Sequence, residues 1–393
     1  MMNRRSFLTG SVGLTLGNLL AGCAGQNRPV LTIRMLNGSI PPQLLNEFRN
    51  YLRQSSNPAT LNFSPEPQIQ TLFSLLQTWK QQKHPTNSFW DWIPFIGNSQ
   101  GRTIPDLVTL GDYWLGQAIR QGLIQPLQPF NFNGWKSLAQ APWQTLVTRN
   151  QQGQPDPKGQ VWAVPYRFGS TVIAYRQDIF KDRGLQPPED WKDLWRPELR
   201  RQISLLDQPR EVIGLVLKSL GASYNTADLK SVPELQAKLQ ALQPQVKLYS
   251  SDAYLQPLLL GDTWLAVGWS ADVLPLMQRS QAIAAVIPKS GTALWADLWV
   301  RPSESTTAIP PLVSEWINFC WQPEIATQLS LLSKATSPII LEKNPISLPL
   351  ELRSNPLLLP NRKTLEASEF LYPLPDQAIT EHQRVWKRLR QAS

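Results

Sequence analysis

The sequence predicts an α/β protein composed of two lobes. Segments typical of buried strands alternate with segments whose apolar residues recur at helical spacing, and this alternation is typical of an α/β fold. Residues 23–393 exceed the roughly 250–300 residues beyond which a single hydrophobic core stops growing, so two lobes are expected. After residue 23, no stretch stays apolar for long enough to span a bilayer.

The first elements follow one another along the chain as strand, helix, helix, strand and helix. Residues 30–36 are typical of a buried strand, and a helix is expected to begin at Pro41-Pro42, because proline in the first turn of a helix costs no hydrogen bond. Residues 104–110 are predicted to form the next strand and residues 114–121 a helix. The intervening helix is predicted from apolar residues at helical spacing, namely Leu72, Leu75, Leu76 and Trp79.

The first 23 residues have the pattern of an export signal. Arg4-Arg5 precede a short apolar run, and small residues precede Cys23, which is the order of features in a cleaved signal. The apolar run, residues 8–21, is shorter than the ~20 residues that a spanning helix needs. The paired arginines resemble a twin-arginine signal, and residues 20–23, Leu-Ala-Gly-Cys, resemble the lipobox of bacterial lipoproteins. The alternative is an ordinary cleaved signal in which the cysteine has no function.

The lipobox resemblance implies that Cys23 becomes the first residue of the mature chain and carries the lipid. We therefore expect residues 1–23 to be removed up to this cysteine, and the protein to work in the periplasm or outside the cell as a membrane-anchored lipoprotein. The other cysteine, Cys320, lies in an apolar segment typical of a buried helix face. With Cys23 modified, no intramolecular disulfide is possible, so stability must come from the hydrophobic core.

The charge of the chain is basic but dispersed. The formal net charge is +9 and the pI is about 9.6, while charged residues make up only 17% of the chain. One basic cluster, residues 387–390, ends a terminal amphipathic helix. This distribution argues against nucleic-acid binding, and proximity to anionic lipid explains the charge more simply.

An aromatic segment interrupted by proline, residues 87–96, lies between two predicted elements. One interpretation is a hydrophobic lid packed on its own lobe. The other is a docking surface for a partner or a membrane, because exposed apolar patches tend to be interaction sites.

A series of short motifs follows in a defined order from residue 105 onward. The most specific is Ile287-Pro288-Lys289-Ser290-Gly291-Thr292, followed by Trp295-Ala296-Asp297. Together the motifs resemble the solute-binding proteins of ABC importers, and within them the spermidine/putrescine-binding branch, over roughly residues 30–375. The other segments that carry the resemblance are residues 105–108, 121–127, 161–171, 173–178, 193–198, 210–214, 220–221, 225–226 and 268–270.

The resemblance implies a two-lobe periplasmic-binding-protein fold, similar to type II, with hinge strands and a central cleft. We expect lobe I to comprise residues 28–171 and 290–313, and lobe II residues 172–289 and 314–393. The ligand is expected at the carboxyl ends of the strands, as in open α/β sheets generally, and closure of the lobes would bury it.

The resemblance also assigns candidate ligand-binding residues. A polyamine needs aromatic walls for its methylenes and cations, worth ~0.5–2 kcal/mol for each cation–π contact, and carboxylates for its ammonium groups. Trp295, Asp297, Trp269, Tyr113 and Glu211 match the binding residues of the family. Each has a structural alternative, since tryptophans are mostly packing residues, Asp297 could form a salt bridge or a cap, and Glu211 could pair with its neighbour at a helix start.

Two positions depart from the family pattern. The segment after the first strand, residues 36–40, contains no tryptophan or tyrosine, and Gln208 stands where an acidic residue is expected, three residues before Glu211. Each departure removes one group that could contact a long polyamine, so a smaller or less charged ligand is also compatible with the sequence.

The sequence therefore predicts a lipid-anchored, monomeric solute-binding protein that delivers a small cationic solute, such as spermidine or putrescine, to an ABC permease. No catalytic residue, cofactor or metal is expected. One alternative is a lipoprotein that uses the binding fold as a scaffold or interaction module. A hydrolase is a third interpretation, since Gly268-Trp269-Ser270 resembles part of a nucleophile elbow and the histidines His84 and His382 are available.

Overall fold

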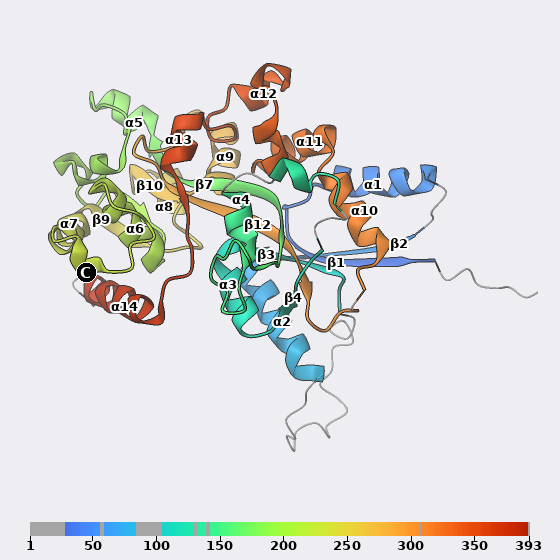
Figure 1. The fold of residues 1–393 in the computed structure, drawn as a ribbon. Coiled ribbons are helices and arrows are strands. Elements are labelled where there is room, and N and C mark those ends of the chain that lie inside the picture. Colours follow the sequence, from blue (N-terminus) through green and yellow to red (C-terminus); the bar gives the residue numbers. More distant parts are fainter. Residues whose placement is uncertain are drawn as a thin grey trace, which may run out of the picture.

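The computed structural model describes residues 28–55, 59–83, 104–128, 132–138, 142–306 and 308–391. The predicted signal with Cys23, the aromatic segment of residues 87–96 and His84 lie outside these residues. The molecule has two lobes, each with its own group of helices, and β-strands pass between the lobes (Figure 1). The predicted α/β class and the two-lobe arrangement are confirmed.

The strands of the two lobes form one sheet with the order β2-β1-β3-β12-β7-β10-β8-β9. The outer pairs β1–β2, β1–β3, β10–β8 and β8–β9 are parallel, whereas the central pairs around β7 and β12 are antiparallel. The bounds of these strands are β1 Val30–Leu36, β2 Thr60–Glu66, β3 Leu107–Gly111, β7 Val164–Arg176, β8 Ile203–Leu205, β9 Val246–Tyr249, β10 Leu265–Trp269 and β12 Ala293–Pro302.

Shorter strands complete the sheets. β11 pairs with β7, while β4 and β13 pair with β12, and β5 and β6 form a separate two-stranded sheet. Their bounds are β4 Ile124–Gln125, β5 Thr148–Arg149, β6 Gln160–Val161, β11 Ile283–Val286 and β13 Glu369–Phe370.

The long strand β7 belongs to both lobes. Its first part pairs with β12, where Gly169 lies opposite Trp295, and its second part pairs with β10, where Val172 lies opposite Gly268. In Figure 1, β7 and β12 run from one group of helices to the other. These two strands therefore connect the parts of the sheet that belong to the two lobes.

Helices cover the sheet in both lobes. Proline begins the first helix as expected, and the helix expected at residues 114–121 begins two residues earlier, at Asp112, directly after β3. The helices are α1 Pro42–Gln54, α2 Ile69–Lys83, α3 Asp112–Arg120, α4 Trp143–Val147, α5 Gln177–Asp182, α6 Pro209–Ser219, α7 Leu235–Leu242, α8 Gln256–Leu260, α9 Ser270–Arg279, α10 Pro311–Cys320, α11 Pro323–Ser333, α12 Leu350–Arg353, α13 Arg362–Ala367 and α14 Asp376–Gln391.

The structure differs from the expected division of the chain in its last eighty residues, which were assigned together to lobe II. Helix α10 packs on lobe I, because its Trp316 lies against the rings of Phe48 and Phe63 at centroid distances of 5.0 and 5.2 Å. Helix α11 contacts both α10 and α1 of lobe I. Cys320 is buried on the same helix, as expected. By contrast, α14 packs in the core of lobe II through Val385 and Leu389.

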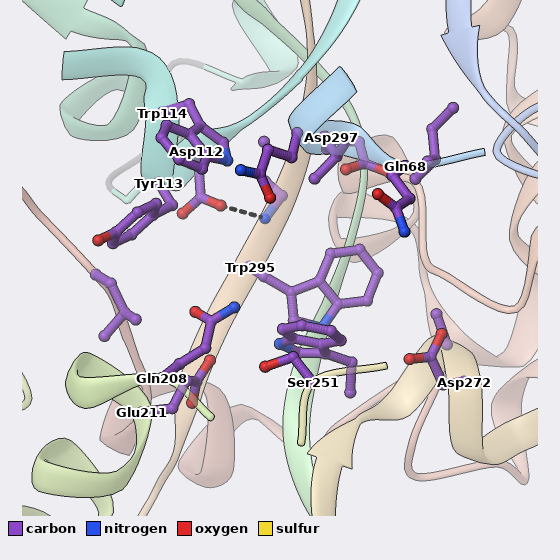
Figure 2. A pocket seen from close by; sticks show the side chains of 18 of the residues that line it. Gln68, Asp112, Tyr113, Trp114, Gln208, Glu211, Ser251, Asp272, Trp295 and Asp297 are labelled. Carbon is purple, nitrogen blue, oxygen red and sulfur yellow. Dashed lines mark hydrogen bonds between the residues drawn. The ribbon is translucent and has the colours of Figure 1, made fainter. Parts of the chain in front are cut away.

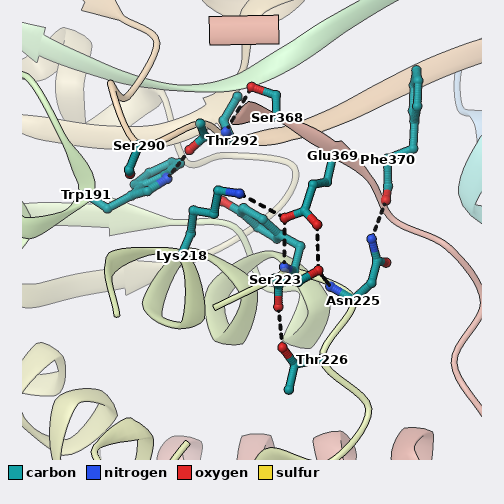
Figure 3. A network of polar contacts seen from close by, with 12 residues as sticks. Trp191, Lys218, Ser223, Asn225, Thr226, Ser290, Thr292, Ser368, Glu369 and Phe370 are labelled. Carbon is teal, nitrogen blue, oxygen red and sulfur yellow. Dashed lines mark hydrogen bonds and ion pairs between the residues drawn. The ribbon is translucent and has the colours of Figure 1, made fainter. Parts of the chain in front are cut away.

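A third connection between the lobes is held by a polar network around β13 (Figure 3). The Glu369 carboxylate accepts hydrogen bonds from Lys218 Nζ and the Tyr224 amide at 3.0 and 3.1 Å, and Asn225 Nδ2 donates to the Phe370 carbonyl at 2.9 Å. Thr292, just before β12, donates its hydroxyl to the carbonyl of Thr171 on β7 at 2.6 Å. The connecting segments are therefore fixed to each other and to α6.

Candidate functional site

A cavity of about 420 Å³ lies between the lobes. It forms where strands end: β1 ends at Leu36, β3 at Gly111 and β10 at Trp269, and all three residues line it. This is the position in which ligands bind to open α/β sheets. All five candidate binding residues from the sequence also line this cavity: Tyr113, Glu211, Trp269, Trp295 and Asp297.

Asp112 is a cavity residue that the sequence analysis missed. It is the first residue of α3, it is buried, and its Oδ1 accepts a hydrogen bond from the Ala296 amide of β12 at 3.0 Å. Burial raises the pKa of Asp112 to about 7. The hydrogen bond from Ala296 and the charge of Arg149 oppose this rise, whereas the nearby Asp297 charge adds to it. Tyr113 follows on the same helix and is 51% exposed, beside the cavity.

Glu211 enters the cavity from the other lobe, in the first turn of α6. Its carboxylate accepts hydrogen bonds from the Thr171 hydroxyl, at 3.0 Å to Oε2 and 3.2 Å to Oε1. Burial raises the pKa of Glu211 to about 7, and hydrogen bonds from Thr171 and Trp269 oppose the shift. The charge of Arg210 also lowers the pKa of Glu211, but the hydrogen-bond donors to Glu211 are neutral, so its carboxylate has no direct ion pair with which a cation in the cavity would compete.

Asp297 has a different environment, because Arg167 of β7 pairs with it. Arg167 Nε donates to Asp297 Oδ2 at 2.6 Å, and both side chains are buried. Burial raises the pKa of Asp297, and the charge and hydrogen bond of Arg167 oppose that rise. The structural alternative for Asp297, a salt bridge, is therefore present, although the residue lines the cavity as well.

Trp295 lies in the middle of the lining residues, with Asp112 and Glu211 to one side and Asp272 to the other (Figure 2). Its indole packs against the backbone of Gly169, where an added Cβ would lie 2.3 Å from the ring. No larger residue fits at that position without moving the ring. The half-buried indole thus forms a fixed aromatic wall.

Further polar groups close the lobe II side of the cavity. Asp272, at the start of α9, accepts a hydrogen bond from the Tyr254 hydroxyl at 2.8 Å, and that hydroxyl accepts one from the Trp269 amide at 3.1 Å. Asp272 and Asp252 are exposed to the cleft. Gln208, which replaces an expected acidic residue, lines the cavity beside Glu211, and Leu36 lines it where an aromatic residue was expected.

The lining is acidic although the chain is basic. Five carboxylates (Asp112, Glu211, Asp252, Asp272 and Asp297) and one basic side chain, Arg167, line the cavity, whereas the whole chain has a formal net charge of +9. Among the described residues, no group of three or more His, Cys, Asp and Glu residues could hold a metal ion. The acidic lining is suited to a positively charged ligand.

Among the described residues, the hydrolase interpretation concerns Ser270 and His382, which have separate surroundings, whereas His84 lies outside those residues. Ser270 Oγ accepts a hydrogen bond from the Ser170 amide at 3.2 Å, while His382 Nε2 lies 3.4 Å from the carbonyl oxygen of Thr226. Ser270 lies at the start of α9, and His382 is buried on α14. These contacts place Ser270 against β7, which connects the lobes, and His382 inside lobe II.

A two-lobe α/β fold with a ligand-sized cleft between the lobes defines a class of solute-binding proteins, and comparison with known proteins identifies the family. Residues 102–365 match the family of bacterial extracellular solute-binding proteins. The chain belongs to this family, as the resemblance predicted.

Characterised relatives bind polyamines, as their names state. The spermidine/putrescine-binding periplasmic protein of Escherichia coli is 25% identical over 265 residues, which cover 67% of this chain and 72% of the relative. Its counterpart from Salmonella typhimurium is 24% identical over 285 residues, covering 72% and 77%.

Solved structures confirm the fold. The spermidine/putrescine ABC transporter substrate-binding protein PotD of Streptococcus pneumoniae superposes with a TM-score of 0.74 at 21% identity, covering 92% of this chain and 99% of that one. A periplasmic thiamin binding protein also superposes, with a TM-score of 0.56 at 16% identity, covering 93% and 96%. Among the described residues, no helix combines the length and apolar character needed to cross a membrane.

Proposed function

We propose that this protein is the lipid-anchored solute-binding component of an ABC importer and that it captures a small cationic solute, polyamine-like in chemistry, in the cleft between its lobes. The observation that carries this proposal is the acidic lining of the cavity in a basic chain. The names of the relatives, which specify spermidine and putrescine, support the same ligand class.

The two lobes would hold the ligand together. Asp112 comes from lobe I and Glu211 from lobe II, and burial raises the pKa of each to about 7. An ammonium group placed between them would favour their ionised forms and replace the lost hydration with charge-assisted hydrogen bonds. Trp295, Trp269 and Tyr113 would provide surfaces for methylenes and for cation–π contacts. Binding would thereby favour the closed arrangement of the lobes that a permease recognises.

A ligand series of constant length tests the proposal. Calorimetric titration of the purified protein at pH 8 should show binding of putrescine, and no binding of 1,4-butanediol or succinate, which have the same chain length but no positive charge. Equal or tighter binding of the diol or the dianion would contradict a cation site. Binding of none of the three, nor of spermidine, would favour the alternative of a scaffold lipoprotein.

The anchor is tested separately. Cys23→Ser should move the protein from the membrane fraction to the soluble fraction, because two acyl chains suffice for stable attachment and each buried methylene contributes ~0.8 kcal/mol. Cys320→Ala, which changes the other cysteine, is the matched control and should stay in the membrane fraction. Retention of Cys23→Ser on washed membranes would rule out this anchor.

The export route is tested at the paired arginines. Replacing Arg4 and Arg5 together by lysine keeps the positive charge but should abolish export, because a twin-arginine signal is an address read by a receptor. Normal processing of the lysine variant would assign the protein to the general secretory route.

A further inference from the structure

The cavity contains a positive charge of its own. Arg167 is buried on β7, and its side chain contacts two of the residues that the family resemblance assigns to the ligand. Its Nε lies 2.6 Å from Asp297 Oδ2, and its guanidinium carbon lies 5.9 Å from the centre of the Trp295 ring. A carboxylate and an indole face are the two groups that bind an alkylammonium ion.

We propose, on the basis of the proposed function, that Arg167 permanently fills one cation subsite of the cleft and thereby makes the protein select a diamine over a triamine. Arg167 takes the place that an inner ammonium group of a longer polyamine would occupy at Asp297 and Trp295. Arg167 is thus a specificity-determining residue.

The structure indicates that a ligand cannot displace Arg167. The guanidinium is fixed by a second contact, from Nη1 to the Ser333 carbonyl at 3.3 Å, and both members of the pair are buried. If an ammonium group of the ligand paired with Asp297 in place of Arg167, the buried arginine charge would lose its partner, which is strongly unfavourable. A further cation over Trp295 would also be repelled by the guanidinium.

The remaining carboxylates suit a ligand with charges at its two ends. Asp112 and Glu211 accept hydrogen bonds from neutral groups, and they lie on one side of Trp295, while Asp272 lies on the other (Figure 2). In this arrangement the two ends of a diamine would lie at acidic groups on opposite sides of the indole, and its methylenes would cross the ring that Arg167 contacts. A triamine would place its inner charged nitrogen near the guanidinium.

The test compares putrescine with spermidine in variants at position 167, by calorimetric titration at pH 8. The wild-type protein should bind putrescine more tightly than spermidine. Arg167→Met frees Asp297, and it should tighten spermidine binding at least tenfold while changing putrescine binding much less. Arg167→Gln, whose amide can still donate to Asp297, should act in the same direction and replaces the methionine variant if that one does not fold.

Two controls isolate the subsite. Arg176→Gln removes one positive charge from the salt bridge with Asp178, which does not line the cavity, and should leave the ratio of the two affinities unchanged. Arg167→Met combined with Asp297→Asn removes both charges and should lose the gain in spermidine binding seen with Arg167→Met alone.

The outcomes separate this inference from the proposed function. Amine binding in the wild type with the same spermidine-to-putrescine ratio in both position-167 variants would overturn the inference and leave the proposed function standing. Amine binding only in those variants would support the inference and assign the wild type a less charged ligand. Absence of amine binding in every variant would reject both.

Discussion

The two groups of buried acids in the cleft differ in one respect, the source of their positive partner. Asp297 has its counter-ion inside the protein, because Arg167 pairs with it at 2.6 Å. Asp112 and Glu211 line the same cavity and are equally buried, but their hydrogen-bond donors are neutral amide, hydroxyl and indole groups. Arg149 and Arg210 act on them only through the field of their charges, without a direct ion pair. Burial alone therefore does not mark a ligand-binding carboxylate; a buried carboxylate without a directly paired counter-ion is the better candidate.

The two groups of acids are therefore expected to have different roles. The pKa of Asp112 and that of Glu211 are raised to about 7 by burial, so both lose free energy on ionising in the empty cleft. In the proposed function, a cation entering the cleft would recover that loss. Asp297 and Arg167 instead compensate each other's charge where β12 pairs with β7.

The largest effect is expected where the internal pair is broken. Asp297→Asn leaves the buried Arg167 without its counter-ion, and loss of one partner of a buried pair costs about 3–5 kcal/mol. Urea unfolding of the ligand-free protein measures this change. Asp178→Asn breaks the more exposed pair with Arg176 and should cost less than about 1 kcal/mol. Similar losses in the two variants would contradict the distinction.

The opposite response is expected at Asp112 and Glu211, which have no directly paired counter-ion. Asp112→Asn and Glu211→Gln remove a carboxylate that is unfavourable when ionised and buried, so each should stabilise the ligand-free protein at pH 8 by about 1–3 kcal/mol. The same variants should weaken putrescine binding about 10–100-fold, because a hydrogen bond to a charged group contributes roughly 1.5–3 kcal/mol. Loss of stability together with loss of binding would indicate a structural role instead.

The ionisation of Asp112 and Glu211 should also make the stability of the ligand-free protein depend on pH. Between about pH 4 and pH 7, Asp112 and Glu211 stay largely protonated in the folded state, where the pKa of each is about 7, while they ionise in the unfolded state. The folded state then binds more protons, so this contribution to the free energy of unfolding decreases as pH rises through that range and is constant above it. The double variant Asp112→Asn/Glu211→Gln should lack this decrease. Parallel pH profiles for the two proteins would contradict the assignment.

Much of the fold could be predicted from local patterns. The first strand has the predicted bounds, Val30–Leu36, and the first helix begins at the predicted proline pair. The lobe that α10 joins could not be predicted, because an apolar helix face such as that of Trp316 fits either core. Only the packing against Phe48 decides the question.

The candidate binding residues could be predicted from the sequence where they stand in a motif that resembles the family. Trp295, Trp269 and Glu211 were found because each stands in a segment that resembles the family. Arg167 lies within such a segment, yet its partner Asp297 is 130 residues away in the sequence, and no local pattern reports a pairing across two hinge strands. Asp112 was missed for a simpler reason: a single acidic residue after a strand is common, and its burial against Ala296 appears only in the fold.

The most direct test of the account is the number of protons released when putrescine binds. At pH 7, Asp112 and Glu211 should each be about half protonated, since the pKa of each is about 7, whereas an alkylamine of pKa near ~10 is already charged. Calorimetric titration in two buffers of different ionisation enthalpy should therefore show release of about one proton per ligand. The release should disappear in Asp112→Asn/Glu211→Gln if that variant still binds. Binding without proton release in the wild type, or with proton uptake, would contradict the claim that these two acids receive the ligand's charge.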